Sequence, residues 1–261
     1  MREKIIDTFT CTVGKAQVAV LMPVHNEAET IEEVVTEFYN IVGSMIPMEL
    51  VLSEDGSTDA TRHIIRELSW KIPLKATLSP CRKGYANGIK NGLALVKSEY
   101  VLITDSDGQH DPKDFWKLWE LRNKYDIVSG WREKRADLFY RKVMSKAFQM
   151  MIKRACNLPN FIDMTAPFKL MKTEIAREIA EECKYMSESF WNEFIIRAYN
   201  KGFSIIEVPV NHRNRKDNSS TRVYKPWKIP KIAWVQLNAL LKLRLEVLNG
   251  KNSVNVSRNY N

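Results

Sequence analysis

The chain has 261 residues, of which 44% are hydrophobic and 27% charged, and this composition excludes a disordered or fibrous protein. Lysine and arginine outnumber aspartate and glutamate by 40 to 31, which gives a formal net charge of +9. The four cysteines, Cys11, Cys81, Cys156 and Cys183, lie far apart, which excludes a disulfide scaffold and a zinc ribbon and favours a reducing compartment.

The first 130 residues alternate between strand-like and helix-like patterns. Strands are predicted at 18–22, 50–52, 74–78, 100–104 and 126–129. Helices are predicted at 29–42, after Ser57 or Thr58, at 84–96 and from Pro112 onward. This alternation predicts an α/β fold, with a mainly parallel sheet and helices on both of its faces.

After residue 130 the pattern becomes more helical and more basic. Amphipathic helices are predicted at 141–156, 187–201 and 226–248, a strand at 203–208 and a polar, basic loop at 211–225. Residues 131–156 carry 8 basic and 2 acidic side chains, and residues 211–261 carry 11 basic and 2 acidic ones. The charge distribution indicates an anionic partner, which could be nucleic acid, anionic lipid or a phosphorylated substrate.

Polar side chains follow three of the predicted strands. They are His25, Asn26 and Glu27, then Glu54 and Asp55, and then Asp105 and Asp107. Ligands of parallel sheets collect at the carboxyl ends of the strands, so we expect these residues in one crevice.

The segment TDSDGQHDP at 104–112 carries the strongest chemical signal. Two carboxylates at one strand end suit Mg2+ or Mn2+, which prefer oxygen ligands. Gln109 could add a neutral oxygen and His110 a nitrogen. Asp105 and Asp107 could instead cap the helix that begins at Pro112, but Asp111 is already placed for that role.

Four motifs in this order resemble the signature series of family 2 glycosyltransferases: PVHNEAETI (23–31), EDGSTDAT (54–61), RKGYANGIKNGL (82–93) and DSDGQHDP (105–112). The resemblance implies an inverting enzyme with the GT-A fold, a Rossmann-like architecture, and a nucleotide-diphospho-sugar donor. Later stretches are similar to the dolichyl-phosphate mannose synthase and polyprenyl-phosphate glycosyltransferase subgroup: SGWR (129–132), Arg141 with Ser145, IDMTAPFKL (162–170), FWNEFIIRA (190–198), GFSIIEVPV (202–210) and RKDNSST (215–221).

The resemblance also implies roles for individual residues. The donor would be bound by Pro23, His25, Asn26, Glu27, Glu54, Asp55, Lys83 and Gly84, with Arg215 in a loop that closes over it. The metal and diphosphate would be held by Asp105, Asp107 and Gln109, and the acceptor phosphate by Arg132, Arg141 and Ser145. Asp105, Asp107, Arg132 and Arg141 would form the catalytic set. The chain departs from the family pattern at Ala166 and Pro167, where Ser-Gly is usual, and at Glu54, where Asp is commoner.

We therefore expect a donor-binding half at 1–130 and an acceptor-binding half of the same domain at 131–225. A basic amphipathic helix and tail would occupy 226–261. The expected reaction moves a hexose from a GDP- or UDP-sugar to a polyprenyl (dolichyl) phosphate. A phosphomonoester is mostly a dianion at pH 7, because its second pKa is about 6, and such a nucleophile needs no strong general base.

The basic amphipathic helices suit a membrane surface, with Trp227 and Trp234 at the interface. They could also pack on the sheet or on a second subunit. No apolar run approaches the ~20 residues of a membrane span, and the N-terminus lacks a signal-peptide pattern. We expect a protein on the cytoplasmic face of a membrane, docked peripherally or through an anchoring partner.

Two other functions fit the sequence less well. A family 2 enzyme that glycosylates a hydroxyl acceptor would need a general base, for which Asp163 and Glu193 are candidates. Glu193 could instead pair with Arg197, one helical turn later. A nucleic-acid-binding protein would explain the basic segments but would leave the acidic crevice without a purpose, so we expect no nucleic-acid partner.

Overall fold

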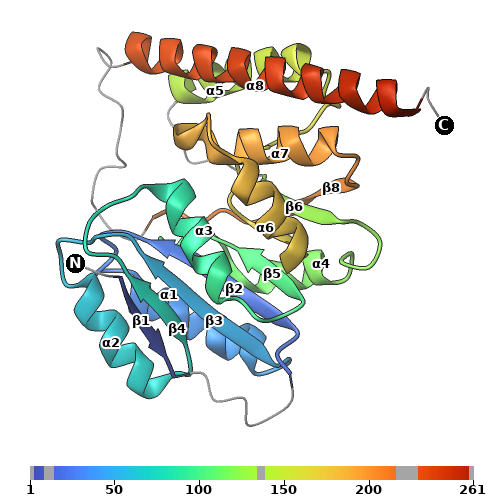
Figure 1. Cartoon of the computed structure of the whole chain (residues 1–261). Helices are drawn as coiled ribbons and strands as arrows, with labels where there is room; N and C mark the ends of the chain where they lie inside the picture. The colour runs from blue at the N-terminus through green and yellow to red at the C-terminus, as the bar shows by residue number, and fades with distance from the viewer. Residues whose placement is uncertain (1–2, 9–14, 134–138, 216–228, 259–261) are drawn as a thin grey trace.

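The computed structural model describes residues 3–8, 15–133, 139–215 and 229–258; within 139–155 and 229–258 it describes the side chains of 147–155 and 233–247. In the described residues the strands form one eight-stranded sheet in the order β1-β4-β3-β2-β5-β7-β6-β8. Figure 1 shows helices on both faces of this sheet. The predicted α/β fold with a mainly parallel sheet is confirmed.

The strands are β1 (Lys4–Asp7), β2 (Val18–Val24), β3 (Met48–Glu54), β4 (Lys75–Leu78), β5 (Tyr100–Ile103), β6 (Ile127–Arg132), β7 (Lys169–Lys172) and β8 (Ile205–Val210). β2 pairs in parallel with β3 and β5, β3 with β4, and β6 with β8. β1 and β7 are antiparallel to their neighbours. The parallel centre places the ends of β2, β3 and β5 at one edge of the sheet.

The helices before β7 are α1 (Ile31–Phe38), α2 (Thr61–Lys71), α3 (Tyr85–Leu95), α4 (Phe115–Trp119) and α5 (Phe139–Ala155). Those after it are α6 (Thr173–Glu182), α7 (Phe190–Asn200) and α8 (Ile229–Arg258). A π-helical turn, η1 (Tyr39–Gly43), extends α1, and 3-10 turns, η2 (Pro112–Asp114) and η3 (Ser187–Ser189), precede α4 and α7.

Two hydrophobic cores lie on opposite faces of the sheet. Val18, Val20 and Met22 of β2 pack with α1, α2 and α4, whereas Ala19 and Leu21 pack with α3, α6, α7 and α8. Alternate residues of a strand point to opposite faces, so a strand that is covered on both faces must be apolar throughout. This explains the continuous apolar run that predicted β2.

β2 continues through Pro23 to Val24, two residues beyond the predicted end. The pairing of β2 with β5 stops at Leu21, whereas its pairing with β3 continues to Val24. The carbonyl of Pro23 accepts a hydrogen bond from the Ser106 hydroxyl, 3.1 Å away, on the side where the β5 ladder has ended. A proline can therefore stay in the strand, because no ladder donor is required there.

The sequence patterns missed β1, β7 and α6. β7 contains Lys169, which is fully buried and donates a hydrogen bond to the Ser129 hydroxyl 2.6 Å away. A charged residue is unexpected in a buried strand, so the sequence pattern did not predict β7. The last strand covers 205–210 and includes Pro209, which an edge strand tolerates. α8 extends ten residues beyond its predicted end at 248. In the described part of the chain, no helix is both long and apolar enough to cross a membrane.

Candidate functional site

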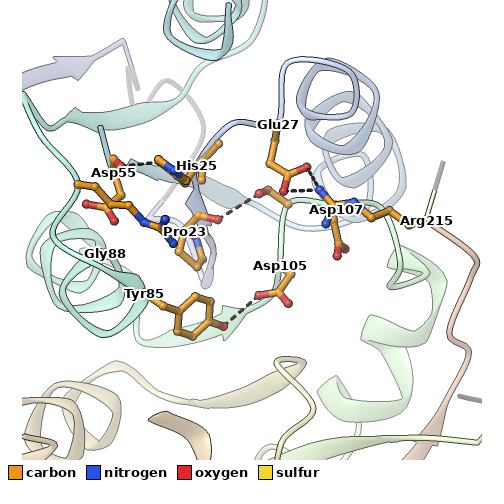
Figure 2. A pocket seen from close by; sticks show the side chains of 12 residues that line it. Pro23, His25, Glu27, Asp55, Tyr85, Gly88, Asp105, Asp107 and Arg215 are labelled. Atoms are coloured by element: carbon orange, nitrogen blue, oxygen red, sulfur yellow. Dashed lines mark hydrogen bonds and ion pairs between the residues drawn. The ribbon is translucent and has the colours of Figure 1, made fainter. Parts of the chain in front are cut away.

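A cavity of about 300 Å3 lies at the carboxyl ends of β2, β3 and β5 (Figure 2). It is lined by Pro23, Val24, His25, Glu27, Asp55, Arg82, Tyr85, Gly88, Asp105, Ser106, Asp107 and Arg215. Seven of these residues were predicted to be in the site. The rest of the predicted donor and metal residues take other positions, described below.

Asp105 and Asp107 follow β5 and both line the cavity. Burial and then the neighbouring carboxylate of Asp107 raise the pKa of Asp105. The turn beyond them needs Gly108, whose φ is +74°, and Asp107 Oδ1 accepts the backbone N–H of Gln109 at 3.1 Å. Two neighbouring carboxylates repel each other when both are ionised, and a bound divalent cation would remove that repulsion.

In the described residues, no group of three or more histidine, cysteine, aspartate or glutamate side chains is arranged to hold a metal ion. Mg2+ is usually held by one or two carboxylates together with substrate phosphate oxygens, and the pair in this cavity suits that arrangement. Asp111, by contrast, accepts the backbone N–H of Lys113 at 3.0 Å and caps the turn that begins at Pro112. The predicted capping role of Asp111 is confirmed.

His25 and Asp55 connect the ends of β2 and β3. Nδ1 of His25 lies 2.8 Å from the backbone oxygen of Asp55. The Asp55 carboxylate accepts the backbone N–H groups of Lys83 at 2.6 Å and Gly84 at 2.7 Å. Gly84 has a φ of +93°, which favours glycine, and immediately precedes α3. Asp55 thus fixes the loop that enters α3 beside the cavity.

Besides Gly84, four of the predicted donor and metal residues do not line the cavity. The Asn26 side chain accepts the backbone N–H of Thr58 at 2.8 Å. The Glu54 carboxylate is buried and bonds to the backbone N–H of Ser57 and to Arg62. Their local bonds show that both side chains stabilise the turn after β3.

The other two are Lys83 and Gln109. The ammonium of Lys83 lies 3.4 Å from a carboxylate oxygen of Glu3, at the surface. The amide of Gln109 donates to the backbone oxygen of Arg213 at 3.4 Å. His110 also lies outside the cavity lining, because its buried ring stacks on Phe168 with 5.0 Å between the ring centroids.

The segment 211–215 crosses the Asp105–Asp111 motif. The backbone N–H of Arg213 donates to the Gln109 oxygen at 2.8 Å, and the Arg213 guanidinium pairs with Glu37 and Asp111, both at 2.9 Å. Arg215 then reaches Glu27 in the cavity, at 2.8 Å. Burial raises the pKa of Glu27, although the Arg215 charge opposes that rise.

Arg132, at the end of β6, is held in a fixed orientation. Its guanidinium donates to both Asp163 oxygens, at 2.7 and 3.1 Å, and to the Thr165 hydroxyl at 2.9 Å. Its charge partly opposes the rise in the pKa of Asp105 that burial and Asp107 cause. Both oxygens of Asp163, one of the two general-base candidates, therefore accept hydrogen bonds from Arg132. The side chains of Arg141 and Ser145 lie outside the described residues.

Glu193 is a structural residue of α7. It is 1% exposed and accepts the backbone N–H groups of Lys184, Tyr185 and Met186 at 2.7–3.0 Å. It also pairs with Arg197 at 2.8 Å, as the one-turn spacing predicted. Glu193 does not line the cavity, and both of its oxygens accept hydrogen bonds inside the protein.

Sequence reasoning missed Val24, Arg82, Tyr85, Gly88 and Ser106 of the cavity lining, although Val24 lies within the motif 23–31. Arg82, Tyr85 and Gly88 lie within the motif 82–93, and Ser106 lies between the two aspartates. Their position in the sequence could have identified them, because each lies within or beside a motif from which other residues were predicted to be in the site. Residue type alone does not separate a lining tyrosine from a core tyrosine.

Solved structures with this fold include glucosyl-3-phosphoglycerate synthase from Mycobacterium tuberculosis in complex with Mn2+, UDP-glucose and phosphoglyceric acid. The match has a TM-score of 0.64 at 16% identity and covers 88% of this chain and 80% of the other. The same protein in complex with UDP matches with a TM-score of 0.63 at 17% identity, over 91% and 87%. This likeness shows the fold.

Curated relatives include the dolichol-phosphate mannosyltransferase of Pyrococcus furiosus, 29% identical over 74% of this chain and 55% of the relative. The undecaprenyl-phosphate 4-deoxy-4-formamido-L-arabinose transferase of Edwardsiella ictaluri is 25% identical, over 78% and 62%. The chain thus spans a little more than half of the length of these relatives. A family model, Glycosyl transferase family 2, matches residues 19–180. The resemblance found in the four motifs is confirmed: the chain belongs to glycosyl transferase family 2.

Proposed function

We propose that the protein transfers a hexose, with inversion, from a nucleotide-diphospho-sugar to a polyprenyl phosphate. The observation that carries the proposal is the shared cavity of Asp105 and Asp107, with the Arg132 guanidinium close enough to act on Asp105 electrostatically. An acidic site for a cation thus lies within electrostatic reach of a fixed cationic group. Such a pairing suits a reaction in which both the leaving group and the nucleophile are phosphates.

The donor diphosphate would lie against Asp105 and Asp107, which would hold Mg2+ or Mn2+ together with its oxygens. When bound, the cation supplies Lewis-acid neutralisation of the negative charge that builds up on the departing diphosphate. Asp55 keeps the Lys83–Gly84 loop in place, and Gly84 lets the backbone approach the donor. His25, Glu27 and Arg215 would line the nucleotide portion.

The acceptor phosphate would be held by Arg132, with Arg141 and Ser145 as further proposed contacts. Arginine presents a rigid fork of donors that suits phosphate oxygens. Asp163 and Thr165 accept hydrogen bonds from Nε and Nη2 of Arg132, so the guanidinium is already held in place and would not need to be ordered when the acceptor binds. The names of both relatives, a dolichol-phosphate and an undecaprenyl-phosphate transferase, support a polyprenyl phosphate acceptor.

The Asp105–Asp107 pair provides the main test. Asp107→Ala should lower the rate of sugar transfer to a short prenyl phosphate by about 100-fold or more, the scale expected when a preorganised charge-stabilising group is lost. Asp126→Asn is the matched control, because Asp126 is at the surface and bonds Ser204 at 2.7 Å. The assay would follow radiolabelled hexose from UDP- and GDP-sugars, with added Mn2+ or Mg2+. Undiminished transfer by Asp107→Ala would refute the proposed site.

Acceptor choice can be tested in the same assay. Prenyl phosphate should accept the sugar, and the matching prenyl alcohol and free sugars should not, because the proposed acceptor contacts Arg132 and Arg141 are cationic and suit an anionic nucleophile. Transfer to the alcohol or to sugars in preference to the phosphate would favour a hydroxyl acceptor. That reaction would need a general base other than Glu193, whose oxygens bond inside the protein.

We further propose that α5 and α8 place the protein on the cytoplasmic face of a membrane. Ile152 of α5 and Ala239, Leu240 and Leu243 of α8 are buried in the core, so both helices pack on the domain. Other apolar side chains of these helices are exposed: Met150 (60%), Trp234 (66%), Leu241 (48%) and Leu245 (62%). Exposed basic side chains accompany them: Arg154, Lys242 and Arg244. This mixture suits the headgroup region of an anionic bilayer.

Vesicle sedimentation tests this proposed surface. The protein should pellet with vesicles that contain phosphatidylserine and less with pure phosphatidylcholine. Trp234→Ala should weaken binding, whereas Trp70→Ala should not, because Trp70 is 84% exposed on α2, at the other end of the molecule (Figure 1). Equal effects of the two substitutions would refute α8 as the docking element.

A further inference from the structure

A chain of hydrogen bonds runs from α7 to Asp105. The indole Nε1–H of Trp191 donates to the hydroxyl oxygen of Tyr85 at 3.0 Å. The Tyr85 hydroxyl in turn donates to Asp105 Oδ1 at 3.0 Å (Figure 2). The chain therefore joins α7, the first residue of α3 and the end of β5. Neither aromatic residue has a role in the function proposed above.

The direction of both hydrogen bonds is fixed by chemistry. An indole N–H can only donate, so the Tyr85 oxygen must be the acceptor from Trp191. The single hydroxyl proton of Tyr85 is then left for Asp105. Because Trp191 sets the orientation of this hydroxyl, its proton is directed to Oδ1.

Trp191 is itself rigidly held. It is 5% exposed, and its ring packs edge-on against Phe190 and Phe194, with centroids 5.1 and 5.3 Å apart. Tyr85 also contacts Phe190 edge-on, at 6.2 Å. The aromatic cluster therefore fixes both donors before any ligand arrives, and Tyr85 is the member that reaches the cavity lining.

We propose that Tyr85, oriented by Trp191, is a positioning residue that holds the Asp105 carboxylate ready for the cation and the donor diphosphate. The inference rests on the function proposed above. A carboxylate can rotate about its last bond, and a fixed donor to one oxygen removes that freedom. Hydrogen-bond partners of metal ligands orient them, and their loss typically costs 10–100-fold in metal affinity or activity.

The test compares two tyrosine-to-phenylalanine substitutions, each of which removes one hydroxyl: the Tyr85 hydroxyl bonds both Trp191 and Asp105, and the Tyr100 hydroxyl bonds Asn123. Tyr85→Phe removes the bond to Asp105. Tyr100→Phe is the matched control, since the Tyr100 hydroxyl donates to Asn123 at 3.0 Å outside the cavity lining. Titration calorimetry would measure Mn2+ binding to the full chain in the presence of UDP and, separately, GDP. Tyr85→Phe should raise the Mn2+ dissociation constant about tenfold, and Tyr100→Phe should leave it within about twofold.

Trp191→Phe should raise the same constant by a smaller factor, because the Tyr85 hydroxyl stays but loses its orientation. The double variant should match Tyr85→Phe alone, since Trp191 acts only through that hydroxyl. In the transfer assay, saturating Mn2+ should restore most of the kcat of Tyr85→Phe. A purely structural role would instead lower kcat at every Mn2+ concentration.

The outcomes separate this inference from the function on which it rests. If the unaltered protein binds Mn2+ with a nucleoside diphosphate and Tyr85→Phe binds it equally well, the positioning role is refuted and the proposed function stands. Additive effects of the two substitutions would also refute it. If the unaltered protein shows no Mn2+-dependent nucleotide binding, both proposals fail.

Discussion

Glu193→Gln should destabilise the protein by about 3–5 kcal/mol, the cost of breaking one side of a buried ion pair. The Glu193 carboxylate is 1% exposed, and both of its oxygens are fully used. One accepts from the backbone of Lys184 at 3.0 Å and from Arg197 Nε at 2.9 Å. The other accepts from the backbone of Tyr185 at 2.9 Å and of Met186 at 2.7 Å.

The magnitude follows from this geometry. Glutamine replaces one oxygen with an NH2 group, so in either orientation two donors of the protein would face another donor. Two hydrogen bonds to a charged group are lost, at about 1.5–3 kcal/mol each. The Arg197 guanidinium, 5% exposed, would also lose part of its compensating charge. The cost of the broken ion pair and the cost of the two lost hydrogen bonds thus both predict a destabilisation of several kcal/mol.

Urea unfolding, followed by tryptophan fluorescence, measures the effect. With an m value of about 3 kcal/mol/M, the midpoint should fall by about 1 M or more. Glu178→Gln is the control, because Glu178 is 48% exposed and pairs with Lys201 at the surface, an interaction of about 0–1 kcal/mol. A midpoint shift no larger than that of the control would refute the reasoning. Loss of sugar transfer at unchanged stability would instead identify Glu193 as a general base.

Three other predictions concern stability. Burial opposes the ionisation of Glu246, but hydrogen bonds and neighbouring charges lower its pKa from 4.5 to about 2. The ionised Glu246 carboxylate therefore adds stability above pH 4.5, and this stability is lost as the pH falls toward 2. The melting temperature of Glu246→Gln should lack this dependence on acid pH. Burial lowers the pKa of Lys169 from 10.5 to about 8, so the unfolded chain binds more protons between these values. Relative to Lys169→Met, stability measured in urea should therefore rise by about 2 kcal/mol from pH 7.5 to pH 10. Gly92→Ala would place a Cβ in steric clash with the fully buried Leu21 side chain and should lower the melting temperature, because such overpacking costs about 1–3 kcal/mol.

The parallel centre of the sheet could be predicted because its signals are local. β2 and β5 are covered on both faces and are apolar throughout, β3 is apolar at 50–52, and the residues that follow these strands mark the edge of the sheet where the cavity lies. β7 could not be predicted, since a lysine stands at each end of its short apolar stretch, and the buried Lys169 is accommodated by a hydrogen bond to Ser129, opposite it on β6. That partner is 40 residues away in the chain.

The site divides in the same way. The sequence by itself determined which side chains stand at the strand ends, because the succession of strands and helices along the chain follows from local residue patterns. Only the tertiary structure decided how these side chains are used. It directs Glu54 to Arg62 instead of the cavity, and it brings Tyr85 between Asp105 and Trp191. The physical reason is that such hydrogen bonds join residues from separate elements, and their geometry exists only once the two cores have packed the helices against the sheet.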